Sequence, residues 1–321
     1  MENKLSPYYS YYMEGISYSK LNPSIAVTYF LKALEYKVTD DVLTALLDCY
    51  SKLDNHESYK SCIDKYAQEG FKVAISRSGI FYAFDSKYKD KEKAEYWFNK
   101  SIELNDLNGY AGYIKALANE TSALGVNLDK VDELLDKALK LNDPRWAGYF
   151  NYLYGTRLID KHDYDKAAKF FELAIKHNYI QAHYNLALLY KDGLGVEKDI
   201  NQCVDHLTKA GTADAFTMLG GIYILGEYAE VDTHIAYLYF YAAAKLGDPV
   251  AAIMAAGILV QKEIYNENYL NQLFEIAFKR GANDQNMKNS YDTIEEAFGE
   301  DLRNKLQSLA EKYWDLHISK A

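Results

Sequence analysis

The sequence predicts an all-α protein made of one helix-pair unit that is repeated along the chain. No stretch of any length alternates apolar and polar residues as a half-buried strand would. The chain has four prolines in 321 residues, and each stands where a helix should begin. Proline is tolerated there because the first-turn amide has no partner within the helix. These prolines are Pro7, Pro23, Pro144 and Pro249. A spaced triple of side chains also recurs along the chain, which indicates a repeat architecture.

The triple consists of a mostly small residue, a large apolar residue four positions later, and Ala or Ser three positions after that. Its members share one face of a helix, the second helix of each predicted pair. From last member to last member the steps are 68, 37, 36, 36, 33 and 34 residues. The triples are Ala26–Phe30–Ala33, Ala94–Phe98–Ser101, Val131–Leu135–Ala138, Ala167–Phe171–Ala174, Cys203–Leu207–Ala210, Ala236–Phe240–Ala243 and Leu270–Phe274–Ala277.

The longest step predicts one further unit, because 68 residues equal two steps of 34. Ala67 stands at its expected place, but Lys60 and Asp64 occupy the other two positions of the triple. The second unit is therefore degenerate, and its helix is expected to use other core residues. These are Tyr59, Ile63 and Tyr66.

The stretch that begins at Ala182 shows the pattern of a whole unit. Ala182, Leu186 and Tyr190 recur at helical spacing. Gly193 and Gly195 then permit a sharp turn, because glycine adopts backbone conformations that other residues avoid. In five units an Asn or Asp residue is placed to cap the second helix. The expected caps are Asn22, Asp90, Asp163, Asp199 and Asp232.

The C-terminal part of the chain departs from the repeat, since the triple stops after Asp284. A last amphipathic helix with a charged outer face is suited to cap the exposed end of a repeat array. Its apolar face would carry Leu302, Leu306, Leu309 and Tyr313. We therefore expect a repeat array over residues 1–284 and a helical cap over residues 285–321, together forming one continuous domain.

Units of this length resemble the tetratricopeptide superfamily. The Ala-Leu-Ala-Tyr-Gly-Gly-Val-Asp pattern within residues 182–199 closely resembles a Sel-one-like repeat. The next unit repeats this pattern more loosely at Ala215, Leu219, Gly220, Tyr223, Gly226 and Asp232. The resemblance implies a right-handed α-solenoid superhelix of about eight antiparallel helix pairs with a C-terminal capping helix. It also implies an adaptor that assembles complexes, and bacterial members often serve signalling or host contact.

Charge and composition argue against several classes of protein. The formal net charge of −10 argues against a nucleic-acid binder, which would usually carry a basic face. The longest apolar run, residues 250–260, is far shorter than the ~20 residues of a membrane-spanning helix, so no membrane insertion is expected. The N-terminus lacks the apolar core of a secretory signal, and three irregularly spaced cysteines fit a reducing compartment. These features predict a cytoplasmic protein.

Motifs of catalysis are not found in the sequence. There is no phosphate-binding loop, zinc-binding His-Glu-x-x-His helix or catalytic serine elbow, so we expect no enzyme activity and no cofactor. One cluster has metal chemistry, because Cys203 and His206 can share a helix face with His183 and His234 nearby. Cys203 nevertheless fills the position that Ala takes in other triples. It is therefore expected to be a buried packing residue rather than a metal ligand.

The function expected from these features is that of a non-enzymatic adaptor or scaffold. It would bind a protein or peptide partner on the concave face of the solenoid, which the first helices of the pairs line. Two alternatives stay open: a cytoplasmic immunity protein that neutralises a bacterial toxin by occlusion, and a metal-dependent enzyme on a repeat scaffold. Because a charged last helix argues against end-to-end stacking, we expect a monomer or a weak dimer.

The tetratricopeptide pattern implies which residues line the concave face. Groove positions lie six and three residues before, and one and four after, the small residue that contacts the second helix. That residue is Gly155, Ala187 or Gly220 in three successive units. The candidate partner-binding residues are Tyr149, Tyr152, Thr156, Gln181, Tyr184, Leu188, Lys191, Asp214 and Thr217, with Ile159 and Ile224 continuing the strip. Its tyrosines would act as rigid anchors; alternatively, they only pack against neighbouring units.

Overall fold

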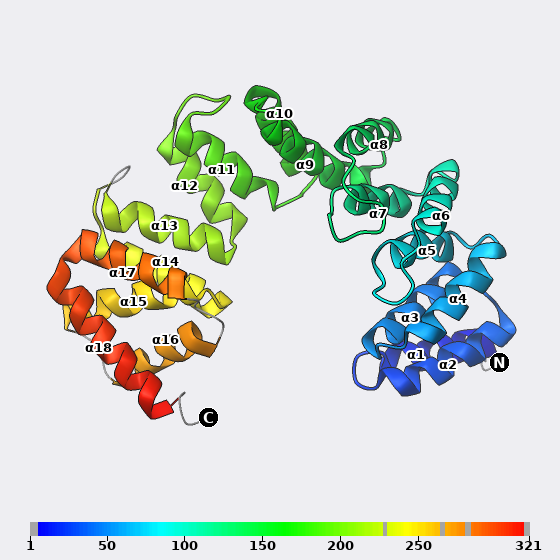
Figure 1. Cartoon of the computed structure of the whole chain (residues 1–321), viewed down its shortest axis with the longest axis horizontal. Helices are drawn as coiled ribbons and strands as arrows, with labels where there is room; N and C mark the ends of the chain where they lie inside the picture. The colour runs from blue at the N-terminus through cyan, green and yellow to red at the C-terminus, as the bar shows by residue number, and fades with distance from the viewer. Residues whose placement is uncertain (1–5, 227–229, 264–266, 280–283, 318–321) are drawn as a thin grey trace, which may run out of the picture. The chain divides into compact units, whose positions relative to one another are not determined.

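The computed structural model describes residues 6–226, 230–263, 267–279 and 284–317. Over these residues it contains eighteen helices, α1 to α18, and no strand (Figure 1). The predicted all-α class is therefore confirmed, with eight successive helix pairs followed by two further helices. The chain divides into two compact units, residues 1–150 and residues 151–321. The division falls within α9 (Pro144–Asp160).

Unit 1 is a stack of helix pairs. Within each pair the two helices pack side by side, and first helices of successive pairs also meet, α3 with α5 and α5 with α7. The helices are α1 (Pro7–Tyr18), α2 (Pro23–Tyr36), α3 (Asp40–Lys52), α4 (His56–Gln68), α5 (Lys72–Phe84), α6 (Lys91–Glu103), α7 (Leu107–Leu117) and α8 (Leu128–Lys140).

Unit 2 continues the same arrangement after α9. Consecutive helices again pack as pairs, and two closing helices, α17 and α18, both pack on α15. The helices are α10 (Tyr164–Lys176), α11 (Ala182–Asp192), α12 (Ile200–Ala210), α13 (Ala213–Leu225), α14 (Thr233–Leu246), α15 (Pro249–Lys262), α16 (Glu267–Lys279), α17 (Asp284–Phe298) and α18 (Glu300–His317).

The repeated triple forms the core of the pairs. Every member of the seven predicted triples is at most 7% exposed to solvent. All seven lie on second helices, from α2 to α16. All four prolines likewise stand at the first position of a helix. The repeat that the spacing predicts is therefore confirmed in the packing.

The degenerate second unit builds its core from other residues than the triple. On α4 the buried side chains are Cys62, Ile63, Tyr66 and Ala67. Lys60 and Asp64 stay at the surface and form an ion pair of 2.6 Å. Tyr59, which was expected in the core, is only half-buried. Its ring stacks on Phe81 of α5, with 5.4 Å between ring centroids, so it packs against the next pair.

A glycine on the first helix faces the phenylalanine of the triple in four pairs. A β-carbon added at such a glycine would lie within 2.4–2.6 Å of the phenylalanine ring. These contacts are Gly15–Phe30, Gly79–Phe98, Gly155–Phe171 and Gly220–Phe240. In the α11–α12 pair, Ala187 replaces the glycine and the smaller Leu207 replaces the phenylalanine, and both are fully buried. The two positions therefore share a limited volume, as the close packing of protein interiors requires.

Two adjacent glycines of α13 allow a matched test of this packing. We expect Gly220→Ala to lower the free energy of unfolding by about 1–2 kcal/mol, because overpacking against Phe240 outweighs the better helix propensity of alanine. Gly221→Ala should instead raise it by up to about 1 kcal/mol, since an added β-carbon there meets nothing within 4 Å. Thermal unfolding of both variants measures the difference. Equal shifts would show that the contact with Phe240 has no energetic weight.

Side-chain caps begin most second helices as predicted. Each such cap accepts a hydrogen bond from the backbone amide two or three residues later. The confirmed caps are Asn22, Asp90, Asp199 and Asp232. Asp163 occupies the cap position of α10 without a side-chain cap bond. Its carboxylate instead pairs with Lys166 Nζ at 2.6 Å.

The loop between α11 and α12 lies directly against the start of α10. Gly193 and Gly195 have φ angles of 71° and 68°. A β-carbon at Gly195 would lie 2.2 Å from the carbonyl carbon of Tyr164 and 2.3 Å from the amide nitrogen of Asp165. Gly195 is thus required both by its left-handed backbone and by the close approach of a second backbone segment.

Two helices, rather than the single one expected, close the C-terminal side of unit 2. Gly299, with a φ angle of 94°, separates α17 from α18. On α18, Leu306 and Tyr313 are buried, as predicted. On α17, Tyr291 and Ile294 are buried. The composition of α17 is mostly polar, and this hides its apolar face in the sequence. The boundary proposed between array and cap at residue 285 stays a prediction.

Candidate functional site

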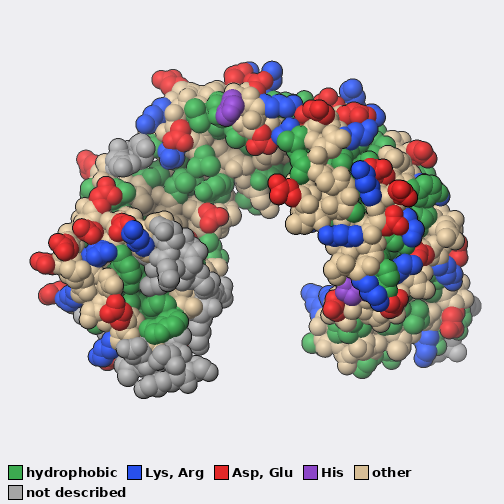
Figure 2. All heavy atoms as spheres, viewed as in Figure 1, with side chains coloured by type: hydrophobic (Ala, Val, Ile, Leu, Met, Phe, Trp, Pro, Cys, Tyr) green, Lys and Arg blue, Asp and Glu red, His purple; other side chains and the backbone are tan. Residues whose placement is uncertain are grey.

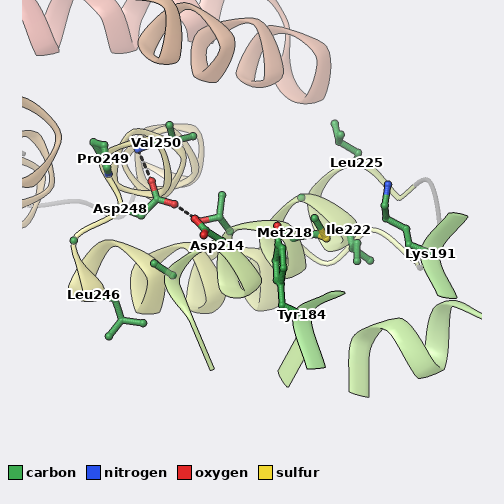
Figure 3. A pocket seen from close by; sticks show the side chains of 14 residues that line it. Tyr184, Lys191, Asp214, Met218, Ile222, Leu225, Leu246, Asp248, Pro249 and Val250 are labelled. Carbon is green, nitrogen blue, oxygen red and sulfur yellow. Dashed lines mark hydrogen bonds between the residues drawn. The ribbon is translucent and has the colours of Figure 1, made fainter. Parts of the chain in front are cut away.

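Unit 2 contains an open groove of about 770 Å³ lined by the first helices α11, α13 and α15 (Figure 3). Tyr184 and Lys191 extend into it from α11. Asp248, Pro249 and Val250 line it from the start of α15. This volume lies within the range of roughly 300–1,000 Å³ that is typical of ligand pockets.

One face of α13 forms the floor of the groove. Asp214, Met218, Gly221 and Leu225 follow one another at spacings of four, three and four residues, which places them on one side of the helix. Gly221 lies at the middle of this row and leaves open space, because an added β-carbon would have no neighbour within 4 Å. The floor is therefore largely apolar, with a gap at its centre.

Carboxylates lie at one end of the groove. Asp248 Oδ1 accepts hydrogen bonds from the backbone amides of Val250 at 2.8 Å and Ala251 at 3.2 Å, which caps α15. Asp248 Oδ2 accepts a hydrogen bond from the Thr217 hydroxyl (Figure 3). Asp214, in the first turn of α13, is exposed and lies beside this pair (Figure 3). The orientation of Asp248 is thus fixed by three hydrogen bonds.

A cation and a phenol complete the polar lining. Lys191 lies far from Asp248, near Leu225 (Figure 3), and its ammonium pairs with Asp192 at 2.9 Å. Burial, and then the charge of Asp214, raises the pKa of the Tyr184 phenol. Tyr184 therefore keeps its proton at neutral pH and can donate a hydrogen bond into the groove.

Four of the nine candidate residues named from the sequence meet in this groove. They are Tyr184, Lys191, Asp214 and Thr217. Residues of α11 and α13 at the same distances from the small residue of their unit thus lie on one surface, as the helical period predicts.

None of the five remaining candidates lines the groove of unit 2. Thr156 donates its hydroxyl hydrogen to the carbonyl oxygen of Leu153 at 2.7 Å. Gln181 is exposed at the start of α11 and makes no cap bond, and Leu188 is half-buried. Tyr149 belongs to unit 1.

A second groove, of about 580 Å³, is lined within unit 1 by α3, α5, α7 and the start of α9. Trp146 and Tyr149 form an aromatic pair on its wall, with 5.8 Å between ring centroids and 71° between ring planes. Its lining is more strongly charged than that of the first groove and includes Lys72, Arg77 and Lys115.

Tyr152 packs within unit 2. Its ring centroid lies 4.9 Å from that of Tyr179 and 6.1 Å from that of the buried Phe171. Ile159 is half-buried against the same core cluster. Ile224 is buried as well, with 3% of its surface exposed, because it lies one helical position away from the groove-facing Leu225.

Several groove residues have only weak signals in the sequence. Gly221 directly follows the small residue Gly220, which is one of the positions expected to line the groove. A glycine has no side chain, however, so the sequence pattern gives no reason to name it as a binding residue. Met218 and Leu225 share its helix face and differ little from core residues in type. Asp248 is recognisable as a helix cap, yet the cap does not show that its second oxygen faces a groove.

The different surroundings of Tyr152 and Tyr184 lead to a stability prediction. We expect Tyr152→Ala to lower the free energy of unfolding by about 2 kcal/mol, because it removes a half-buried ring from the core. Tyr184→Ala should lower it by less, about 1 kcal/mol, since that ring packs on the core of α11–α13 but also borders an open groove. Urea denaturation of both variants provides the comparison. A loss for Tyr184→Ala as large as for Tyr152→Ala would mark Tyr184 as a core residue.

The cluster considered for metal binding is arranged for packing. Cys203 is fully buried, and burial raises the pKa of its thiol to about 11. His183 Nδ1 and His206 Nδ1 face each other at 2.7 Å, and the ring of Tyr190 stacks on His206. Within the described residues, no group of three or more His, Cys, Asp or Glu side chains is placed to hold a metal ion.

The histidine pair predicts a loss of stability in mild acid. Burial first, and then nearby cationic charge, lowers the pKa of both imidazoles; Lys209 adds to this effect and Asp205 opposes it. Their folded-state pKa values thus lie below the unfolded value of ~6.5. The stabilisation is complete above about pH 6.5 and is lost as the pH falls from there through the folded-state values.

We therefore expect the melting temperature to fall between pH 7.5 and pH 5.5, and to fall less in His206→Gln than in the unmodified chain. The exposed His234 serves as a control, because His234→Gln should leave the pH dependence unchanged. The same pH dependence in His206→Gln as in the unmodified chain would contradict a role for the pair.

The described helices include none that is long and apolar enough to cross a membrane. On the face of each unit shown in Figure 2, acidic and basic side chains are interspersed among apolar ones. This distribution is that of a mixed, solvated surface.

Comparison with known proteins identifies the family. Short helix pairs that share one buried triple define a helical-repeat protein. The family model of the Sel1 repeat matches five segments that together cover more than half of the chain, so the chain belongs to the Sel1 repeat family. The matched segments are residues 2–35, 74–106, 145–179, 180–214 and 213–248.

Curated relatives share part of this chain. The ERAD-associated E3 ubiquitin-protein ligase component HRD3B of Arabidopsis thaliana is 31% identical over 140 residues, 43% of this chain and 16% of the relative. Protein sel-1 homolog 2 of Mus musculus is 35% identical over 99 residues, 30% of this chain and 11% of the relative. The matched part of this chain thus spans less than a fifth of the length of either relative.

Two solved structures of bacterial proteins share this fold. A Sel1 repeat protein from Oxalobacter formigenes is 22% identical with a TM-score of 0.55, covering 73% of this chain and all of that one. A protective antigen of uropathogenic Escherichia coli with an SLR fold is 17% identical with a TM-score of 0.55, covering 98% of this chain and 69% of that one. These similarities show the fold.

Proposed function

We propose that this chain is a non-enzymatic adaptor or scaffold that binds a segment of a partner protein in the groove of α11, α13 and α15. The groove itself carries the proposal, because its apolar floor opens at Gly221 and polar groups lie at both ends. An apolar centre with a polar rim is the composition of protein-binding sites. A partner side chain above Gly221 would approach the α13 backbone closely.

Two further observations support binding over catalysis. The described residues that line this groove include no histidine and no cysteine, and Asp248 is engaged in three hydrogen bonds. The relative HRD3B is named as a component of an E3 ubiquitin ligase, which is a role within an assembly. An adaptor role for this chain is consistent with that relationship.

A test of the proposal uses the open space at Gly221. In Gly221→Trp the indole should occupy the groove while the fold persists, because an added β-carbon meets no neighbour within 4 Å. Extracts of the source organism are passed over immobilised unmodified chain and over Gly221→Trp, and the captured proteins are quantified by mass spectrometry. Proteins retained by the unmodified chain and lost from Gly221→Trp are partners of the groove.

Affinity measurements with such a purified partner complete the test. Tyr184→Ala should weaken binding by about 1–3 kcal/mol, as expected of an aromatic anchor. The matched control is Tyr96→Ala, which removes a 58%-exposed tyrosine from α6 and should leave the affinity unchanged. If Gly221→Trp and the unmodified chain retain the same proteins with the same affinity, the groove is not the binding site.

A further inference from the structure

The chemistry of the groove indicates which kind of segment it accepts, and this step rests on the proposed function. On the same helix as the open position at Gly221, Met218, Ile222 and Leu225 provide an apolar lining. A large apolar side chain can enter there and lose its contact with water, whereas a charged one would lose its hydration without a partner.

The carboxylate end of the groove favours a cation. Asp248 is held by the amides of Val250 and Ala251 and by the Thr217 hydroxyl. Those amides are the first of α15, at the positive end of its helix dipole. Asp214 adds a second, exposed carboxylate on the same rim.

The cation of the groove does not neutralise this end. Among the fourteen described residues that line the groove, Lys191 is the only cation. It lies at the far end in Figure 3 and pairs with Asp192. The net charge of −10 acts in the same direction, because it attracts cationic segments over longer distances.

From this we infer that the groove binds a peptide segment in which a large apolar residue is flanked by a lysine or arginine. The apolar side chain would lie over Gly221, and the cation would lie between Asp214 and Asp248. A phosphate-bearing ligand is disfavoured at this end, because two carboxylates would repel it.

The probe for this inference is a phage-displayed library of random dodecapeptides. It is selected in parallel against the immobilised unmodified chain, Gly221→Trp and Asp214→Lys. We expect the unmodified chain to enrich peptides that pair a large apolar residue with an adjacent Lys or Arg. Gly221→Trp should not enrich them, and Asp214→Lys should lose the preference for the cation.

A synthetic peptide from this selection then gives affinities by fluorescence anisotropy. Asp214→Lys should weaken its binding roughly tenfold or more, and added salt should weaken binding to the unmodified chain. The matched control is Asp129→Lys, which reverses another exposed charge, in the first turn of α8, and should leave the affinity unchanged.

The outcomes separate this inference from the proposed function. Enrichment of neutral or acidic peptides that Gly221→Trp fails to bind would overturn the inferred chemistry and leave the groove as a binding site. Equal enrichment by the unmodified chain and Gly221→Trp, or no enrichment by either, would count against both.

Discussion

Deletion of residues 300–321 should leave unit 2 poorly soluble and much less stable. The deletion removes α18, on which Leu306 and Tyr313 are buried, with 0% and 7% of their surfaces exposed. Tyr313 lies 5.8 Å from Phe274 between ring centroids. A buried large apolar side chain contributes ~1.5–3 kcal/mol, so these two alone account for on the order of 5 kcal/mol. Unfolding free energies of whole domains are only about 5–15 kcal/mol.

Point variants on α18 distinguish the loss of packing from a general effect of truncation. Leu306→Ala should lower the free energy of unfolding by about 2–5 kcal/mol, since it leaves a cavity in the core that also contains Gly257 and Ile294. Lys305→Ala changes the exposed neighbouring residue and should cost less than about 0.5 kcal/mol. Thermal melts and sedimentation of all three proteins give the result. A truncated chain as soluble and heat-stable as the full one would show that α18 does not cap the core.

The repeat core is the part of the fold that the sequence predicts well. Close packing forces the same volumes into the same positions of each pair, so positions such as Ala26, Phe171 and Ala243 repeat in the sequence and are all fully buried. In the α11–α12 pair the larger Ala187 is matched by the smaller Leu207, where other pairs have a glycine and a phenylalanine. The summed volume stays similar, so the pattern is still recognisable there.

Elements without that constraint are harder to predict. The helix α4 buries Cys62 in place of the expected triple, and α17 has too few buried apolar residues for its face to stand out. The helix α4 packs on α3 and α5, and α17 packs on α15 and α18. Such tertiary contacts have no local signal.

The candidate site, too, could be predicted from the sequence only in part. The helical period brings Tyr184, Asp214 and Thr217 to one surface, because groove residues repeat with the units. It places Ile224 wrongly, since a difference of one residue turns a side chain by about 100°. The open space at Gly221 depends on three helices together, so it becomes visible only in the structure.

The last prediction concerns Gly195, whose replacement by alanine should be among the most damaging single changes in the chain. The left-handed backbone at this position costs about 1–2 kcal/mol for an L-residue with a β-carbon. The new methyl group would also lie within 2.2–2.5 Å of the backbone of Tyr164 and Asp165. Backbone atoms at the start of a helix cannot move aside as a side-chain tip can. We therefore expect a further ~1–3 kcal/mol from overpacking.

Gly211 provides the control that separates these two costs. It ends α12 with a φ angle of 62°, close to the 68° of Gly195, but an added β-carbon there meets nothing within 4 Å. Gly211→Ala should thus lower the free energy of unfolding by the backbone cost alone, about 1–2 kcal/mol. Gly195→Ala should lower it further, by the cost of displacing the loop from α10. Chemical denaturation of both variants measures this excess. If the two variants are destabilised equally, the loop between α11 and α12 is not held against α10 in solution.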